Sequence, residues 1–92
     1  MPGPLVLTIY SRPRCHLCEE MKAVIVDVLR ATRTTARVVE INVETDADLE
    51  GRFGLEVPVL LVNGKKIAKY RIAEEELRRI LQARSEEAGG AG

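Results

Sequence analysis

The sequence of 92 residues has no tryptophan, only three other aromatic residues, one histidine and no excess of charge of either sign. Proteins that bind nucleic acid usually carry a basic excess, so we expect no nucleic-acid partner. No hydrophobic run approaches the roughly 20 residues of a membrane-spanning helix, and the first residues do not resemble a signal peptide. We therefore expect a cytoplasmic protein with no membrane contact. A chain of this length is expected to form a single domain over residues 1–92.

The only two cysteines, Cys15 and Cys18, stand three positions apart. A disulfide between them closes a ring that stabilises a fold by only about 2 kcal/mol in the chain-entropy model, and cytoplasmic thiols would tend to reduce it. A purely structural disulfide is therefore a poor explanation of the pair. Three interpretations remain: redox catalysis, part of a metal site, or two inert thiols. A structural zinc ion usually takes four ligands, of which this pair supplies two.

Hydrophobic patterning predicts four strands and three helices. The strands are expected at residues 5–10, 37–43, 58–62 and 65–70, and the helices at about 15–31, 45–54 and 73–84. This order, βαβ-α-ββ-α, predicts an α/β fold with a four-stranded mixed sheet flanked by three helices, which can cover both of its faces. The last residues, 86–92, are small and polar, and we expect a disordered tail there.

Several residues predict the ends of these elements. Thr45 is expected to cap the second helix, and Gly54 to end it as a C′ residue. Asn63-Gly64 between two strand-like runs predicts a two-residue hairpin. The lysines of the following run suit an exposed edge strand.

Cys15 is expected where the first strand passes into the first helix, an environment that favours a thiolate. The helix N-terminus offers unpaired N–H groups, Arg12 and Arg14 add positive charge, and the thiol of Cys18 can donate to the Cys15 sulfur. Such surroundings lower the pKa of a cysteine from about 8.5 to between about 3.5 and 7.5. We predict Cys15 as the exposed nucleophile and Cys18 as the buried resolving thiol. His16 is either an exposed first-turn residue or, as imidazolium, a second source of charge beside the thiolate.

Pro58 belongs to the same site if its strand runs antiparallel to the first one, because its amino end then lies beside Cys15. A cis Val57–Pro58 bond there would leave the Val57 N–H and C=O available to an extended thiol substrate. Tyr10, at the end of the first strand, is either a packing residue or a substrate contact.

Three motifs together resemble the glutaredoxin branch of the thioredoxin superfamily over residues 5 to about 84. They are Tyr10-Ser11-x-x-x-Cys15-x-x-Cys18, Val57-Pro58 and Asn63-Gly64. The resemblance implies a thioredoxin-like fold in which Cys15 attacks a disulfide or a glutathione mixed disulfide and Cys18 resolves it. It also implies that Val57 and a cis Pro58 dock the substrate, together with Arg12, Arg14, His16 and Tyr10 nearby. We expect a monomer with no tightly bound cofactor.

The chain departs from that family at two places. His16-Leu17 separates the cysteines, and residues 68–72 stand where the family has two glycines and an aspartate that hold glutathione. The electron donor therefore stays open between glutathione and a reductase. Two other classes also stay open: a dimeric carrier of an iron–sulfur cluster or metal that uses Cys15, and a thioredoxin-fold interaction module without turnover.

Overall fold

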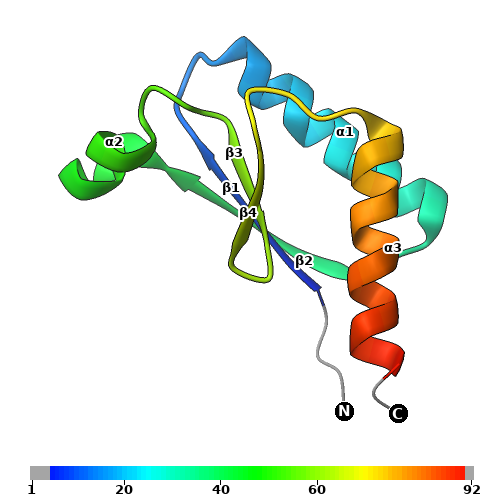
Figure 1. Ribbon diagram of the computed structural model, residues 1–92. Coiled ribbons are helices and arrows are strands. Elements are labelled where there is room, and N and C mark those ends of the chain that lie inside the picture. Colours follow the sequence, from blue (N-terminus) through cyan, green and yellow to red (C-terminus); the bar gives the residue numbers. More distant parts are fainter. Residues whose placement is uncertain (1–4, 91–92) are drawn as a thin grey trace.

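The structure, a computed structural model, describes residues 5–90, and side chains as far as Arg84. One four-stranded sheet has the order β2-β1-β3-β4. Its strands are β1 (Leu5–Ser11), β2 (Ala36–Asn42), β3 (Val59–Val62) and β4 (Lys65–Lys69). The helices are α1 (His16–Thr32), α2 (Ala47–Phe53), α3 (Glu74–Gly90) and the short 3-10 helix η1 (Val43–Thr45) (Figure 1). Because β1 is parallel to β2 and antiparallel to β3, the sheet is mixed, as predicted.

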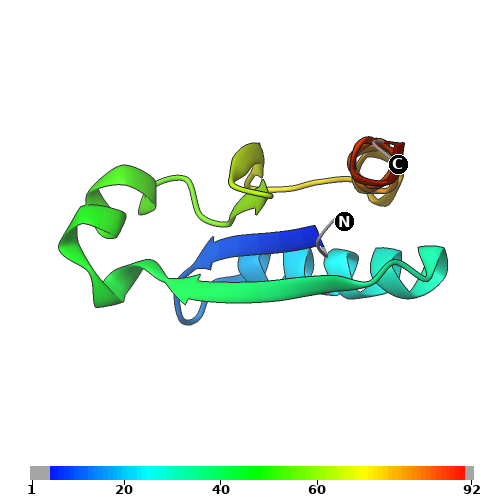
Figure 2. The same cartoon turned by 90° about the horizontal axis from the view of Figure 1, so that it is seen from below.

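The hydrophobic core lies between one face of the sheet and the helices α1 and α3. Alternate residues of β1 are buried, and Leu7 and Ile9 have no exposed surface. They pack with Ile25 of α1 and Leu77 of α3, so both helices cover the same face of the sheet. Figure 2 shows the strands in a twisted layer beside α1, with α3 seen end-on. This arrangement holds the first turn of α1 rigidly at the carboxyl end of β1.

Helix α2 lies beyond the carboxyl ends of β1 and β2 instead of covering the second face of the sheet (Figure 1). Its Phe53 stacks on Tyr10, with ring centroids 4.4 Å apart and ring planes inclined by 14°. The three predicted helices are present, and because α2 has only seven residues and none of them is buried, the hydrophobic core is covered by α1 and α3.

The start of α2 also differs from the prediction. Asp46, and not Thr45, is its N-cap, and the Asp46 carboxylate accepts from the N–H groups of Asp48 and Leu49 at 2.8 and 3.3 Å. Thr45 closes η1, and its hydroxyl donates to the Asn42 carbonyl at 2.7 Å. Thr45 and Asp46 can each cap a helix. Because Thr45 belongs to the 3-10 helix η1, the N-cap of α2 is one position later than predicted. Val43, which was predicted to end the second strand, belongs to η1 instead.

Gly54 ends α2 for a different reason from the one predicted. Its φ of −55° and ψ of −35° are right-handed, so it is not the left-handed C′ residue that we expected. A Cβ atom at this position would meet the side chain of Glu50, the Glu50 carbonyl at 2.5 Å and Nη2 of Arg12 at 2.9 Å. Glycine is required here by close packing.

The hairpin between β3 and β4 is the predicted one. Asn63 and Gly64 have φ values of 50° and 84°, as a two-residue turn of the favoured type requires. Asn63 also holds β1, because its N–H donates to the Val6 carbonyl at 2.8 Å and its Oδ1 accepts from the Val6 N–H at 2.9 Å. Strand β4 is an edge of the sheet, as its lysines indicated.

Helix α3 is longer than predicted. It continues past Arg84 to Gly90, so residues 86–90 of the expected disordered tail are helical, and residues 91–92 lie outside the described residues. The sequence after Arg84 has no proline, and its first glycine is Gly89, so no strong helix-breaking residue follows the predicted end. No helix among residues 5–90 is long and apolar enough to span a membrane.

Candidate functional site

Cys15 is the N-cap of α1, with an extended backbone at φ −103° and ψ 106°. Its sulfur accepts a hydrogen bond from the backbone N–H of Cys18 at 3.1 Å, and its carbonyl accepts from the Glu19 N–H at 3.1 Å. A helix N-terminus concentrates unpaired N–H groups and partial positive charge. The local fold therefore places the unpaired N–H groups and the partial positive charge of the helix N-terminus beside the Cys15 sulfur.

The two cysteines form a disulfide in this structure, with their Cα atoms 5.1 Å apart. Cys18 lies in the interior with 1% of its surface exposed, whereas Cys15 is half-buried. A reactant from solvent therefore meets Cys15 first, and the position three residues along the helix keeps Cys18 within bonding distance of it.

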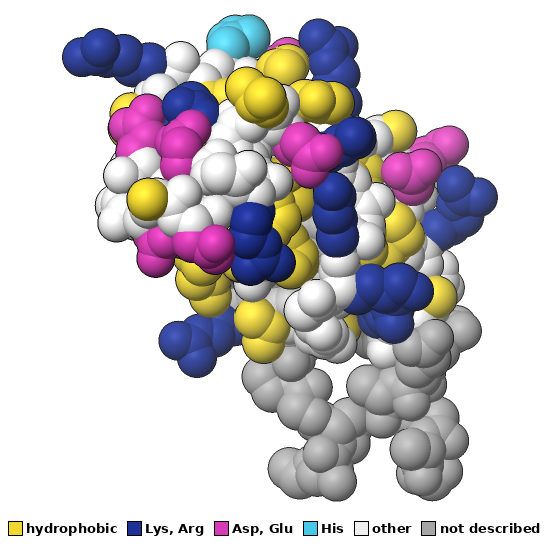
Figure 3. Space-filling model, turned by 60° about the vertical axis from the view of Figure 1, so that its left-hand side comes forward, with side chains coloured by type: hydrophobic (Ala, Val, Ile, Leu, Met, Phe, Trp, Pro, Cys, Tyr) yellow, Lys and Arg dark blue, Asp and Glu magenta, His cyan; other side chains and the backbone are white. Residues whose placement is uncertain are grey.

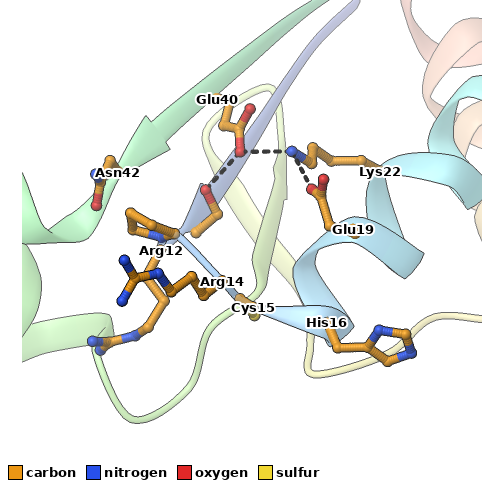
Figure 4. A pocket seen from close by; sticks show the side chains of 10 residues that line it. Arg12, Arg14, Cys15, His16, Glu19, Lys22, Glu40 and Asn42 are labelled. Atoms are coloured by element: carbon orange, nitrogen blue, oxygen red, sulfur yellow. Dashed lines mark hydrogen bonds and ion pairs between the residues drawn. The ribbon is translucent and has the colours of Figure 1, made fainter.

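A pocket of about 500 Å³ opens beside Cys15 (Figure 4). The end of β1 and the following loop form one side, the first turns of α1 another, and β2 the third. Most of the residues that line it are polar or charged, and we call it the polar pocket. Besides Cys15, they are Ser11, Arg12, Pro13, Arg14, His16, Glu19, Lys22, Glu40 and Asn42.

Four side chains that line this pocket form a network of hydrogen bonds and ion pairs that no sequence motif predicted. Glu40 of β2 accepts from the buried Ser11 hydroxyl at 2.8 Å and from Lys22 of α1 at 3.1 Å, and Lys22 also pairs with Glu19. The Ser11 hydroxyl, and then Lys22, hold the pKa of Glu40 below its ordinary value. Hydrogen bonds to Glu19 and Glu40 raise the pKa of Lys22. No motif connects residues so far apart in sequence, so only the fold could place them together.

The two arginines before the cysteines have different surroundings. Arg12 binds Glu50 and the Gly54 carbonyl, each at 2.6 Å, and reaches Glu44 at 3.4 Å. Its guanidinium therefore ties α2 and η1 to the end of β1. Arg14 is exposed, with a left-handed φ of 61°. In Figure 4 both side chains lead away from Cys15.

His16 is an exposed first-turn residue. Its imidazole is 90% exposed and lies 3.9 Å from Glu20, one turn further along α1. Figure 3 shows this single histidine standing out at the upper end of the molecule, with hydrophobic side chains at the surface close to it. Tyr10 faces α2, and its stacking on Phe53 supports the packing interpretation of this residue.

Val57 and Pro58 come directly before β3, which lies on the side of β1 opposite β2. Their peptide bond is cis, as the sequence analysis anticipated. Because Tyr10 pairs with Val59 in the antiparallel β1–β3 ladder, Pro58 comes beside Ser11 at the carboxyl end of β1. The Pro58 carbonyl accepts from the N–H of Tyr70 at 2.8 Å, so the segment after β4 lies against it. Among the described residues, Val57 makes no backbone hydrogen bond outside the sheet.

The described residues contain no group of three or more histidine, cysteine or acidic side chains placed to hold a metal ion. A strand–helix junction that carries an internal disulfide at the helix N-terminus, on a four-stranded mixed sheet, defines a thioredoxin-fold protein with a cysteine pair suited to redox chemistry.

Residues 6–82 match the family model of the glutaredoxin-like domain (DUF836), and the chain therefore belongs to this glutaredoxin-like family. It is 29% identical over 75 residues to the glutaredoxin-like protein YDR286C homolog of Dictyostelium discoideum, a match that spans 77% of this chain and 69% of that protein.

Solved structures agree with this placement. Protein XcR50 of X. campestris is 34% identical, with a TM-score of 0.64 over 84% of this chain and 96% of its own. Protein Ne2328 of Nitrosomonas europaea has a TM-score of 0.67 at 24% identity and covers 87% of this chain and 94% of its own. The Drosophila melanogaster thioredoxin Deadhead has a TM-score of 0.56 at 21% identity, over 87% of this chain and 80% of its own. The last two establish the fold alone.

Proposed function

We propose that this protein is a thiol–disulfide oxidoreductase that reduces disulfides or glutathione mixed disulfides, with Cys15 as nucleophile and Cys18 as resolving thiol. The observation that carries the proposal is the position of the Cys15 sulfur, half-buried at the N-terminus of α1 and 3.1 Å from the Cys18 N–H. An N–H donor and the positive end of a helix stabilise a thiolate more than a thiol.

The reaction consists of two exchanges. The Cys15 thiolate attacks one sulfur of the substrate disulfide, a mixed disulfide forms, and the other substrate sulfur leaves as a thiolate. The Cys18 thiolate then attacks the Cys15 sulfur, the Cys15–Cys18 disulfide forms, and the second substrate thiolate leaves. The substrate gains two electrons, its thiolates take protons from water, and the protein ends in the disulfide form seen here.

Return to the dithiol requires two electrons from a donor. Two molecules of glutathione or one dithiol of a reductase supply them, and no tightly bound cofactor takes part. We propose that the protein works as a monomer in the cytoplasm, where thiol pools keep such donors reduced.

On the substrate side, Val57 and Pro58 supply the docking edge. The free N–H and C=O of Val57 suit pairing with an extended chain that carries the disulfide. Arg14 and His16 line the pocket beside Cys15, and in this proposal they contact the part of the substrate that leaves. Arg12 and Tyr10 act by holding this frame in place, through Glu50 and Phe53 respectively.

The test compares the unmodified protein with Cys15→Ser and Cys18→Ser in two assays. One follows glutathione-dependent reduction of a small mixed disulfide, and the other follows reduction of a protein disulfide. We expect Cys15→Ser to abolish both activities. Cys18→Ser is expected to lose the second and keep the first, since a mixed disulfide with glutathione needs only one protein thiol.

Ala83→Ser, on the exposed surface of α3, serves as the matched control and is expected to keep both activities. Activity that survives in Cys15→Ser would contradict the assignment of the nucleophile. Failure of the unmodified protein in both assays, together with colour or metal in protein purified without oxygen, would favour the cluster carrier instead.

A further inference from the structure

Tyr70, in the segment between β4 and α3, has an unusual backbone conformation for a bulky residue. Its φ is 69°, in the left-handed region that glycine adopts freely and that costs other residues about 1 kcal/mol. A large aromatic residue in a glycine conformation indicates that its ring is needed where it lies.

Contacts on two sides hold the tyrosine in this position. Its N–H donates to the Pro58 carbonyl at 2.8 Å, and its hydroxyl donates to the Leu55 carbonyl at 3.2 Å. The Lys69 ammonium lies 5.6 Å from the centre of its ring. Tyr70 therefore contacts both ends of the segment from Leu55 to Pro58, which contains the cis Val57–Pro58 bond.

The same residue reaches the cysteine motif. Tyr70 and Leu17, which lies between the two cysteines, line one small pocket on the side of α1 away from the polar pocket. Figure 1 shows the three segments involved meeting at the upper end of the molecule: the start of α1, the loop before β3 and the segment after β4. Tyr70 thus lies at the edge of the surface where the proposed substrate docks.

This edge is apolar and open. Leu55 is 93% exposed and Tyr70 is 42% exposed, and both are among the few large hydrophobic residues that the described chain leaves at its surface. The Tyr70 ring offers contact area at little entropic cost because its hydrogen bond to the Leu55 carbonyl already holds it, and the Leu55 side chain is open to solvent.

We infer that Tyr70 and Leu55 form a specificity surface that selects polypeptide disulfides with an apolar side chain next to the cysteine. The inference rests on the proposed function and deepens it. Leu55 and Tyr70 present apolar side chains at this edge, which suit an apolar side chain of a polypeptide substrate. The favoured substrate is therefore a protein disulfide.

The test uses the first exchange alone, in the Cys18→Ser background, so that no external reductant is needed. The substrates are two peptides with a cysteine in mixed disulfide with thionitrobenzoate, identical except for leucine or serine before the cysteine. Cys15 forms a disulfide with the peptide sulfur and releases one coloured thionitrobenzoate anion, which stopped-flow absorbance follows. We expect the leucine peptide to react about tenfold faster, as a buried apolar side chain allows.

In that background, Leu55→Ser and Tyr70→Gly are expected to reduce this ratio to about twofold or less. Tyr70→Gly also tests the fold, because glycine suits the left-handed φ and should raise the midpoint of thermal unfolding. Val38→Ser is the control: Val38 is 47% exposed on β2, the edge strand opposite β4, and its loss should leave the ratio unchanged.

Equal rates for the two peptides, or a preference that survives both substitutions, would overturn the specificity surface while leaving the oxidoreductase intact. Failure of the proposed function has a separate signature, since Cys15 would then react with both peptides no faster than free cysteine does.

Discussion

The backbone N–H of Cys18 donates to the sulfur of Cys15 across 3.1 Å, so Cys18 holds the Cys15 sulfur through its main chain as well as through the disulfide. This contact is the N-terminal cap of α1. It depends on the helix and not on the disulfide, and it is available to the thiolate once the disulfide is reduced.

Titration of the reduced protein tests this cap. We expect Cys15 to ionise clearly below the pKa of free cysteine, about 8.5, because the capped thiolate accepts a hydrogen bond at the positive end of α1. The pH dependence of iodoacetamide alkylation measures it. His16→Ala is the matched variant, and since this imidazole is 90% exposed and faces Glu20, its loss should hardly move the curve. A Cys15 that alkylates like free cysteine would contradict the proposed chemistry.

Substitution of Arg12 should lower the stability of the fold, whereas substitution of Arg14 should lower the reactivity of Cys15. Arg12→Gln breaks a half-buried set of bonds to Glu50 and Gly54, and we expect a loss of about 1–2 kcal/mol in unfolding free energy. Arg14→Gln should leave stability within about 0.5 kcal/mol because the side chain is exposed. Arg14→Gln is expected instead to slow the reaction of Cys15 with an anionic disulfide at low salt. Urea unfolding and stopped-flow rates measure the two effects, and the reverse pattern would reject both assignments.

Gly54 and Gly51 provide a matched pair in and beside α2. Gly54→Ala should destabilise the protein by about 2 kcal/mol, because the new methyl group would press on the Glu50 carbonyl and on Arg12. Gly51→Ala places its methyl group in open space within the helix, and a gain of about 0.5–1 kcal/mol is expected. Chemical denaturation of both variants gives the comparison. Equal effects would mean that Arg12 and Glu50 do not constrain this turn.

The network behind the polar pocket should make stability depend on pH. Hydrogen bonds from Ser11 and Lys22 hold the pKa of Glu40 below 4.5, so its stabilisation is complete above that pH and is lost as the pH falls through the lowered value. Glu40→Gln should therefore cost about 1 kcal/mol at pH 7, and the difference from the unmodified protein should shrink in acid.

Asp27→Asn, on the exposed surface of α1, is the control for that change of charge. The midpoint of thermal unfolding, measured from pH 3 to pH 7, reports the effect, because this range includes the ordinary pKa of a glutamate, about 4.5. If the loss of stability caused by Glu40→Gln stays constant over this range, the Glu40 carboxylate is not held by Ser11 and Lys22.

Local patterns in the sequence determined the order of the elements, the position of Cys15 at the start of a helix and the hairpin at Asn63. Each depends on residues close together in the chain, where periodicity, capping and turn chemistry act directly. The patterns were less reliable at element ends: Asp46 took the cap expected at Thr45, and α3 continued to Gly90.

Only the tertiary structure decided what the side chains at these positions contact. Arg12 lines the pocket beside Cys15, near which it was predicted, and its bond to Glu50 also ties α2 to the sheet. Glu40 and Lys22 meet in the same pocket, although nothing in the sequence pairs them. The left-handed conformation of Tyr70 and its bond to Leu55 were equally hidden. Such contacts join segments that are distant in sequence, and their geometry exists only after the sheet has brought those segments together.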